Sequence, residues 1–200
     1  ATIGFSQTAA GQIARQFDAA AATQIVAAPA TAEARGGAQV ATTRLPWDAV
    51  DRVTRLAGVE AASLLSKVER DGGTITAVAV NDPSAPAVAS PALYASSAEL
   101  LDTVGGRVVT GRTFDSGHDA RGDRVALLGA RAADTLGINR VDTQPSVFID
   151  GIAYAVVGIF ADVERTGELL DAVVIPTGAA RADFGLAAAD DVRAKIAIGA

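Results

Sequence analysis

Apolar and polar positions at the start of the chain follow first a helical and then a strand pattern. Ile13 and Phe17 stand four residues apart, which is the spacing of one helix face, and Ser6 is a suitable N-cap. These features predict a helix over residues 6–22. The β-branched run that follows ends at a proline, so we predict a strand over residues 23–28.

A loop and a second helix are expected next. Residues 30–43 are small and polar with a glycine pair, and they predict a loop. The second helix is expected to begin at Pro46, since the N–H that proline lacks would be unpaired in the first turn anyway, and to stop at Gly58. Its buried face is expected to consist of Trp47, Val50, Val53 and Leu56.

Two β-prone runs and a change of composition follow this helix. The runs, at residues 59–69 and 74–80, are joined by an Asp-Gly turn, which favours a hairpin between them. Residues 81–91 hold several prolines among small residues and predict a connection between two lobes. A short helix is expected over residues 92–101, where Leu93 and Leu100 are among its apolar residues.

Short apolar runs dominate the second half of the chain and predict mostly strands. One helix is expected over residues 130–136 and a last helical segment over 176–184. Asp150-Gly151 stands between two apolar runs, where it predicts a tight hairpin turn. The predicted strands are residues 124–128, 146–149, 152–161 and 172–175.

These elements predict an α+β fold with two lobes. Residues 192–198 alternate between apolar and polar, as a half-buried strand does, and they return after a mostly β segment. The sheet that lacks a strand belongs to the first part of the chain. We therefore predict that residues 1–89 and 186–200 form one αβ sandwich lobe, with a β-rich lobe of residues 90–185 inserted into it.

Composition and charge exclude several classes of protein. The net charge is -6, the pI is near 4.7, and the 17 basic residues are scattered, so we expect no nucleic-acid partner. The absence of cysteine excludes disulfides and thiolate sites. No window approaches the roughly 18 consecutive apolar residues of a membrane-spanning helix. The chain also lacks methionine, and we expect it to be a segment of a longer protein.

His118, the single histidine, is the first candidate for a functional residue. It stands in a loop with three carboxylates, and such a group is able to bind a divalent cation. The spacing lacks the alternation of ligands and backbone carbonyls that oxygen sites show, so we interpret the segment as a solvated turn and predict no metal site. The carboxylates are Asp115, Asp119 and Asp123.

Other motifs do not indicate catalysis or cofactor binding. Arg121-Gly122-Asp123 matches a cell-adhesion tripeptide, but Gly-Asp before a strand is ordinary turn chemistry. No serine stands in a nucleophile elbow, and the glycine pairs lack the spacing of phosphate loops. A carboxylate pair of the glycosidase type stays open, since no pattern selects two of the 23 acidic residues. We expect Trp47 and Phe114 to be core or lobe-contact residues rather than ligand platforms.

Six segments stand in an order that resembles one family, the extracytoplasmic core domain of MacB-like and FtsX-like ABC transporter permeases. The segments are a helix with a Gly-Val turn at 47–62, a proline-flanked aromatic segment at 90–94, Gly-Arg-x-Phe at 111–114, Val-Ala-Leu-Leu-Gly at 125–129, an apolar hairpin around Asp150-Gly151 with Val156–Ile159, and Val-Ile-Pro at 174–176. The resemblance covers nearly the whole chain.

The resemblance implies a non-catalytic domain outside the bacterial cytoplasmic membrane, without cofactor or metal, between two membrane helices of a permease. Its implied function is to couple ATP-driven helix movement to cargo handling or partner regulation. The implied partners are the permease's own transmembrane helices, a cytoplasmic ATPase subunit, a second permease copy, and extracytoplasmic protein or lipid cargo. The alternative is a free-standing secreted binding or adhesion module, and an enzyme that depends on His118 is a third.

Overall fold

One mixed sheet links ten strands in the part of the chain that the structure describes. The computed structural model describes residues 24–33, 39–70, 72–78, 90–164 and 166–196. Along the sheet the order is β1 (Gln24–Ala27), β12 (Asp191–Ile196), β4 (Val59–Lys67), β6 (Ala92–Ser96), β11 (Ala172–Pro176), β8 (Val125–Gly129), β10 (Ile152–Ala161), β9 (Ser146–Ile149) and β5 (Ile75–Thr76), and β7 (Arg107–Gly111) also pairs with β10.

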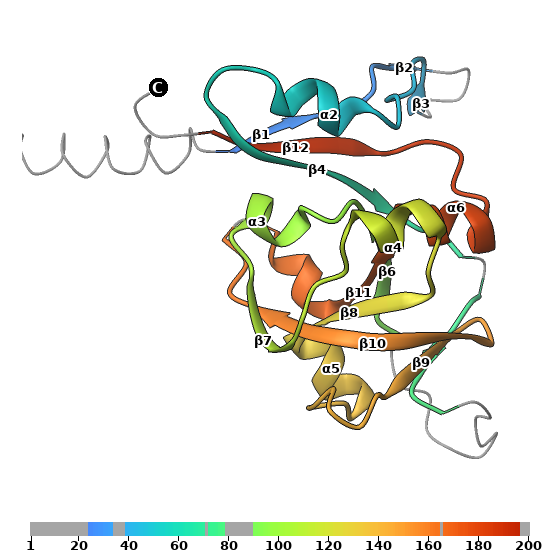
Figure 1. Ribbon diagram of the computed structural model, residues 1–200. Helices are drawn as coiled ribbons and strands as arrows, with labels where there is room; N and C mark the ends of the chain where they lie inside the picture. Colours follow the sequence, from blue (N-terminus) through green and yellow to red (C-terminus); the bar gives the residue numbers. More distant parts are fainter. Residues whose placement is uncertain (1–23, 34–38, 71, 79–89, 165, 197–200) are drawn as a thin grey trace, which may run out of the picture.

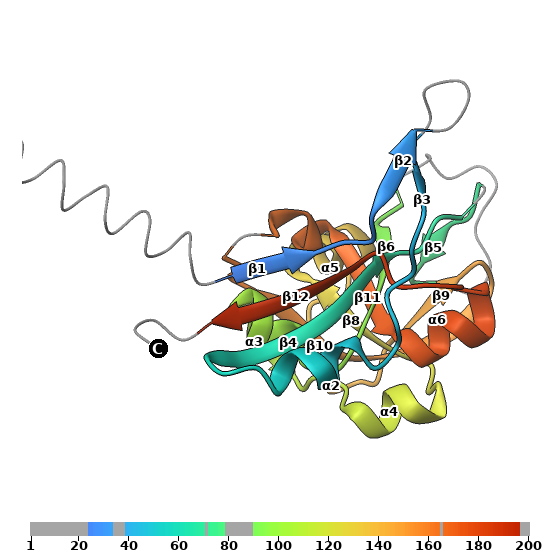
Figure 2. The same cartoon turned by 90° about the horizontal axis from the view of Figure 1, so that it is seen from above.

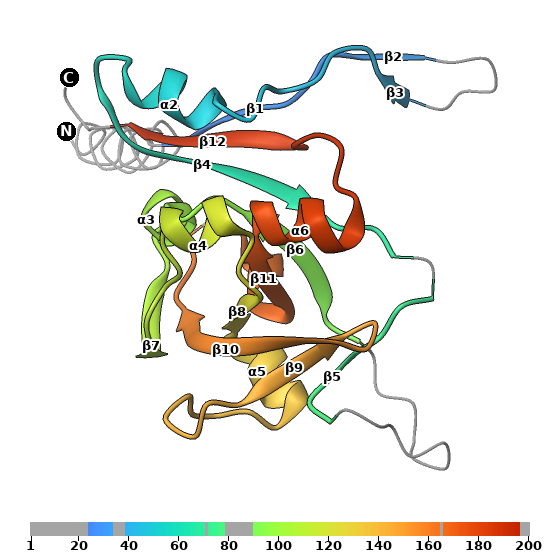
Figure 3. The same ribbon diagram turned by 45° about the vertical axis from the view of Figure 1, so that its right-hand side comes forward.

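The helices lie against both faces of this sheet. Figure 1 shows α2 (Ala49–Thr54) above the layer of β1, β12 and β4, with α3 (Leu100–Val104), α4 (Ser116–Arg121) and α6 (Thr177–Phe184) below that layer. Figure 3 shows the same arrangement from a second side. A further helix, α5 (Ala130–Leu136), packs on β8 and β10, and the 3-10 helix η1 (Gly167–Asp171) leads into β11.

The last described strand, β12, joins the same sheet as the first, β1, in agreement with the strand predicted over residues 192–198. β12 pairs antiparallel with both β1 and β4, so Gln24 lies opposite Lys195. The sheet continues from β4 to β6, and β6 and β8 run parallel to β11 and β10 respectively. These parallel and antiparallel pairs, together with the helices, confirm the predicted α+β class.

Elements in the second half agree closely with the prediction. The helix α5, the strands β9 and β10, and the hairpin turn between these strands all stand at the predicted residues. At the turn, Asp150 and Gly151 have φ angles of 50° and 82°, the left-handed values that a two-residue hairpin turn requires. The predicted helix over 176–184 is found as α6.

The predicted helix over residues 92–101 is wrong. Its first half is the strand β6, which lies between β4 and β11, and only its end enters α3. Leu93 and Ala95 are buried on this strand, whereas Tyr94 is half-buried. Because the two large residues of this strand, Leu93 and Tyr94, are adjacent, the alternation is weak in the sequence, and pairing with two neighbours decides its structure.

The predicted hairpin of residues 59–69 with 74–80 is also wrong. β4 pairs with β12 and β6, whereas the short β5 pairs with β9. Asp150 helps to hold this second pairing, because its N–H donates to the Thr74 carbonyl and its carboxylate lies 3.0 Å from the Arg70 guanidinium. These contacts, distant in sequence, override the local turn signal.

Three smaller differences concern the first half and the segment before α4. The predicted loop over 30–43 contains the antiparallel pair β2 (Thr31–Glu33) and β3 (Gln39–Ala41), which projects from the sheet in Figure 2. Leu56, expected on the buried face of the second helix, is 60% exposed, and Ala49 is buried in its place. β7 was not predicted. The helix expected over 6–22 and most of the connection 81–91 lie outside the described residues.

The hydrophobic core contains Phe114, as predicted for this residue. Phe114 is 1% exposed and packs in a cluster with α3 residues such as Leu100, with Leu65 of β4 and with Phe160 of β10. A second cluster lies around β8, β10 and β11, and a third joins α2 to Leu64 and Val192. Residues of both predicted lobes share one sheet, and the division into two lobes stays a prediction.

Tyr154 is fully buried, and a polar network satisfies its hydroxyl group. The Tyr154 hydroxyl donates to Asp183 Oδ2 at 2.7 Å, and Arg124 donates to both oxygens of the same carboxylate. The hydrogen bond from Arg124 holds the pKa of Asp183 below its usual range. This network therefore joins the end of α6 to β10 and to the start of β8.

Replacing Asp183 by alanine is expected to lower the free energy of unfolding by about 2 kcal/mol at pH 7, because the Tyr154 hydroxyl loses its acceptor inside the protein. Since the folded-state pKa is lowered, the carboxylate stabilises the fold above about pH 4, and this contribution is lost as the pH falls through the folded-state value. Urea unfolding should therefore show a difference between variant and parent that shrinks in acid. A pH-independent difference would contradict this account.

Candidate functional site

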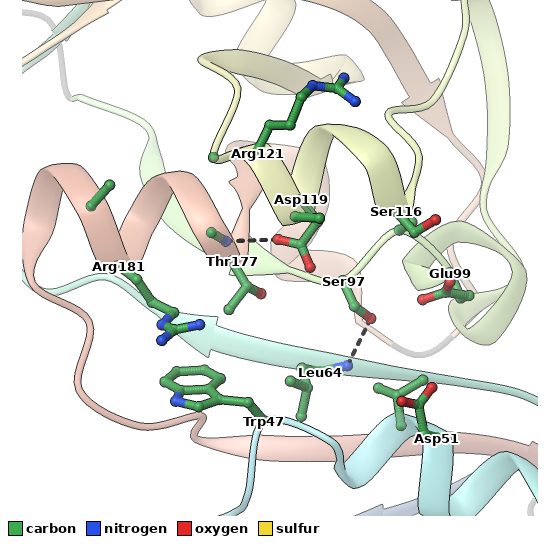
Figure 4. A pocket seen from close by; sticks show the side chains of 16 residues that line it. Trp47, Asp51, Leu64, Ser97, Glu99, Ser116, Asp119, Arg121, Thr177 and Arg181 are labelled. Atoms are coloured by element: carbon green, nitrogen blue, oxygen red, sulfur yellow. Dashed lines mark hydrogen bonds between the residues drawn. The ribbon is translucent and has the colours of Figure 1, made fainter.

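A cleft of about 610 Å³ lies between α2, α4 and α6, with the middle of β4 behind it. Figure 4 shows its lining, which comes from five separate parts of the chain. The segment before and within α2 contributes Trp47 and Asp51, and β4 contributes Leu64. The turn before α3 contributes Ser97 and Glu99. The remaining lining comes from α4 and α6, chiefly Ser116, Asp119, Thr177 and Arg181.

Close packing of α4 against α6 forms one wall of the cleft. Asp119 Oδ1 accepts a hydrogen bond of 2.6 Å from the Gly178 N–H, so a carboxylate of α4 caps the first turn of α6. A side chain at Gly178 would overlap the Asp119 carbonyl oxygen. Glycine at this position therefore permits the contact between the two helices.

Three carboxylates face the cleft from different elements. Figure 4 shows Asp51 on α2, Glu99 on the turn before α3 and Asp119 on α4, all directed toward the same space. Burial raises the pKa of Asp119, the hydrogen bond from Gly178 opposes this rise, and the negative charge of Glu99 adds to it. The Glu99 charge thus disfavours the ionised form of Asp119 across the cleft, and the positive charge of Arg181 favours it.

Arg181 is the cationic group that faces this space. Its guanidinium carbon lies 4.7 Å from the centre of the Trp47 ring, the geometry of a cation–π contact. Among the described residues Arg181 forms no salt bridge. In contrast, Arg121 points away from the cleft in Figure 4 and pairs with Asp123. Trp47, expected as a core or lobe-contact residue, packs on the third cluster with one part and lines the cleft with another.

His118 lies in a helix, which corrects the expectation of a solvated turn. It is the third residue of α4, and its side chain is 14% exposed. Asp115 is the N-cap: its carboxylate accepts from the His118 N–H at 3.0 Å and lies 2.7 Å from Nδ1 of the same residue. The backbone hydrogen bond from His118 is the main cause of the lowered pKa of Asp115. His118 and Asp115 therefore begin the helix together.

The four residues considered for a metal site do not form one cluster. Asp119 accepts a hydrogen bond from the Gly178 N–H, Asp123 pairs with Arg121, and only Asp115 contacts His118. In the residues that the structure describes, no group of three or more metal-ligating side chains is found. The Arg-Gly-Asp tripeptide is the end of α4, where Gly122 is the C-cap and the two charged groups bind each other.

The sequence did not indicate the residues of the cleft. Asp51, Glu99 and Arg181 belong to segments far apart in the chain, and none stands in a motif with fixed spacing. Trp47 drew attention as the single tryptophan, whereas Asp119 and Arg121 were considered for a metal site and an adhesion motif rather than for a cleft. Only the return of β12 and the contact between α4 and α6 bring these segments to one place.

Solved structures of other proteins share this fold. The periplasmic region of MacB from Actinobacillus actinomycetemcomitans has a TM-score of 0.65 and 14% identity, over 89% of this chain and 76% of that one. The extracellular domain of the ABC-type transporter YknZ from Gram-positive bacteria has a TM-score of 0.60 and 14% identity, over 86% of this chain and 83% of that one. These two likenesses show that the chain shares the fold of these domains.

A comparison of the sequence with models of protein families shows the family of this chain. The model of the MacB-like periplasmic core domain matches residues 1–198, and the chain belongs to this family of ABC transporter permease domains. The comparison with curated proteins gives no match. The described part of the chain contains no helix with the length and apolar character needed to cross a membrane. Family membership confirms the resemblance and the extracytoplasmic location that it implies.

Proposed function

We propose that this chain is a non-catalytic domain that couples ATP-driven movement of permease helices to cargo handling or partner regulation outside the membrane. The observation that carries the proposal is the antiparallel pairing of β1 with β12, which sets Gln24 opposite Lys195. The chain therefore enters and leaves the sheet at neighbouring points, as Figure 1 also indicates. A domain held between two adjacent membrane helices needs this geometry.

The proposal includes the division into two lobes. Residues 1–89 with 186–200 form the membrane-proximal lobe, and residues 90–185 form the outer lobe inserted into it. Support comes from β1, β12 and β4, which lie together with α2 packed on them, while most other strands lie on the far side of α3, α4 and α6 (Figure 3). The cleft lies between these two groups of elements, where a change in their relative position would alter it.

The proposed partners are those that membership of this permease-domain family implies. The permease's own membrane helices adjoin β1 and β12, and a cytoplasmic ATPase subunit drives them. A second permease copy completes the transporter, and an extracytoplasmic protein or lipid is the cargo or the regulated partner. The acidic surface, with a net charge of -6, agrees with the proposed absence of a nucleic-acid partner.

The test replaces residues 24–196 by a short Gly-Ser linker in the parent permease, together with its ATPase subunit. Since paired residues of an antiparallel ladder lie about 5 Å apart, such a linker keeps the two flanking segments at their spacing. We expect membrane insertion and ATP hydrolysis to persist, whereas transport or partner activation falls to background. Transport at the parental rate would overturn the proposal.

A second variant controls for general damage. It replaces residues 31–41, the hairpin that projects from the sheet, by a two-residue Asn-Gly turn. The N–H of Thr42 donates to the Ala30 carbonyl at 2.8 Å, so the two ends are already adjacent. This variant should retain transport, which would assign the loss in the first variant to the domain as a whole.

A further inference from the structure

We propose that the cleft between α2, α4 and α6 binds a guanidinium or alkylammonium group carried by a side chain of an extracytoplasmic polypeptide. This inference deepens the proposed function and rests on it for the source of the ligand. The site itself rests on four features of the cleft: its size, its aromatic surface, its charge, and the group that already occupies part of it.

The size suits one side chain with the peptide around it. About 610 Å³ lies within the range of roughly 300–1,000 Å³ found for pockets that hold small ligands. Apolar side chains, Leu64 and Val50 among them, line the cleft together with the carboxylates and offer contacts for an aliphatic stem. A long basic side chain combines an apolar stem with a charged end in the same way.

The charge of the cleft selects a cation. Asp51, Glu99 and Asp119 face it, and Glu99 already raises the pKa of Asp119. Bringing a positive group between them would relieve this repulsion. Ser97 is 8% exposed, and its Oγ accepts from the Leu64 N–H, which leaves a lone pair for a ligand N–H. An anion would instead meet these three carboxylates, opposed only by the Arg181 guanidinium that lies on the Trp47 ring.

Arg181 shows which chemistry the aromatic surface accepts. Its guanidinium lies over the Trp47 ring at 4.7 Å, and it forms no salt bridge with any described residue. A residue of this protein thus occupies the position that a guanidinium of the ligand would take. An incoming side chain displaces Arg181 from the ring and lies closer to the carboxylates. Trp47 and Arg181 come from segments far apart in sequence, so ligand binding would also alter the contact between them.

The test uses the fluorescence of Trp47, the single tryptophan of the chain. The 200-residue chain is titrated at fixed ionic strength with acetyl-Gly-Arg-Gly-amide, with acetyl-Gly-Glu-Gly-amide and with spermidine. We expect a saturable change with the arginine peptide and none with the glutamate peptide. Tighter binding of spermidine than of the arginine peptide would overturn the assignment to a polypeptide, and the lack of any saturable response would overturn the site.

Variants locate the binding. Glu99→Gln and Asp51→Asn should each weaken the arginine peptide about fivefold, the effect of removing one partly exposed ion pair. Glu60→Gln is the matched control, since this exposed residue lies outside the cleft and should bind as the parent does. Arg181→Ala removes the internal occupant and should tighten binding about fivefold. Weaker binding in Arg181→Ala, or equal effects of Glu99→Gln and Glu60→Gln, would overturn the proposal.

Failure of this inference is distinguishable from failure of the proposed function. Peptide titration needs neither membrane nor ATPase, whereas the linker replacement measures transport. If the chain does not bind the arginine peptide but transport still requires residues 24–196, only the proposed cleft ligand is refuted. If the chain binds the peptide but the permease transports equally well without residues 24–196, the proposed coupling function is refuted.

Discussion

Replacing Phe114 by alanine is expected to lower the free energy of unfolding by about 3–5 kcal/mol, the loss that follows when a buried phenyl ring leaves a cavity. Phe114 is 1% exposed and lies in the cluster that joins α3 to β4 and β10. The side chains around it belong to several packed elements, α3, β4 and β10 among them, so the site can collapse only in part. Urea unfolding, followed by circular dichroism, measures the change.

Val109→Ala is the control for Phe114→Ala. Val109 stands on β7, close in sequence to Phe114, but it is 54% exposed. Its replacement should change the free energy of unfolding by less than about 0.5 kcal/mol, as is usual for exposed positions. A loss below about 1 kcal/mol in Phe114→Ala would mean that the ring does not pack as described.

Gly178→Ala is expected to destabilise the fold by about 3 kcal/mol, at the upper end for overpacking. A Cβ at this position would overlap the Asp119 carbonyl oxygen and lie 3.3 Å from Gly122 Cα, and these backbone atoms cannot rotate away. α4 and α6 must then separate, which also breaks the hydrogen bond from Gly178 to Asp119. Thermal and urea unfolding measure the loss, and a change in Trp47 fluorescence would report the altered cleft.

Gly167→Ala is the matched control for Gly178→Ala. Nothing lies within 4 Å of a Cβ built at Gly167, so the same added methyl group should change stability by less than about 0.5 kcal/mol. Equal stability of Gly178→Ala and Gly167→Ala would show that α4 and α6 do not need their close contact. The pair of variants therefore separates the effect of the contact from that of a glycine replacement in general.

The sequence predicted well those elements whose partners are near in the chain. β9 and β10 are joined by Asp150-Gly151, and the turn determines their register locally. The prediction was wrong where partners are distant. β6 lies between β4 and β11, and no residue within Ala92–Ser96 signals either neighbour. The two-residue β5 likewise depends on β9 rather than on the Asp-Gly turn before it.

The candidate site was not predictable for the same reason. His118 drew attention by its chemistry, yet it serves to begin α4 with Asp115. The cleft is lined by Glu99 and Arg181, which are ordinary surface residue types in the sequence and acquire meaning only through the fold. Family resemblance rests on core and turn residues, Phe114 among them, and these define the scaffold rather than the cleft.

The pairing of β1 with β12 has a mechanical consequence. When the two flanking segments move apart, the load falls on the hydrogen bonds between Gln24 and Lys195 first and then on each next pair in turn, so the strands unzip under small force. When both segments move together along the strands, β1 and β12 are displaced as one unit, and the bonds between β12 and β4 share the load in shear along the whole length of β12. The sheet therefore opens easily when the two flanking segments separate, and it resists their common displacement along the strands. Motion of the second kind would be transmitted to β4, whereas motion of the first kind would not.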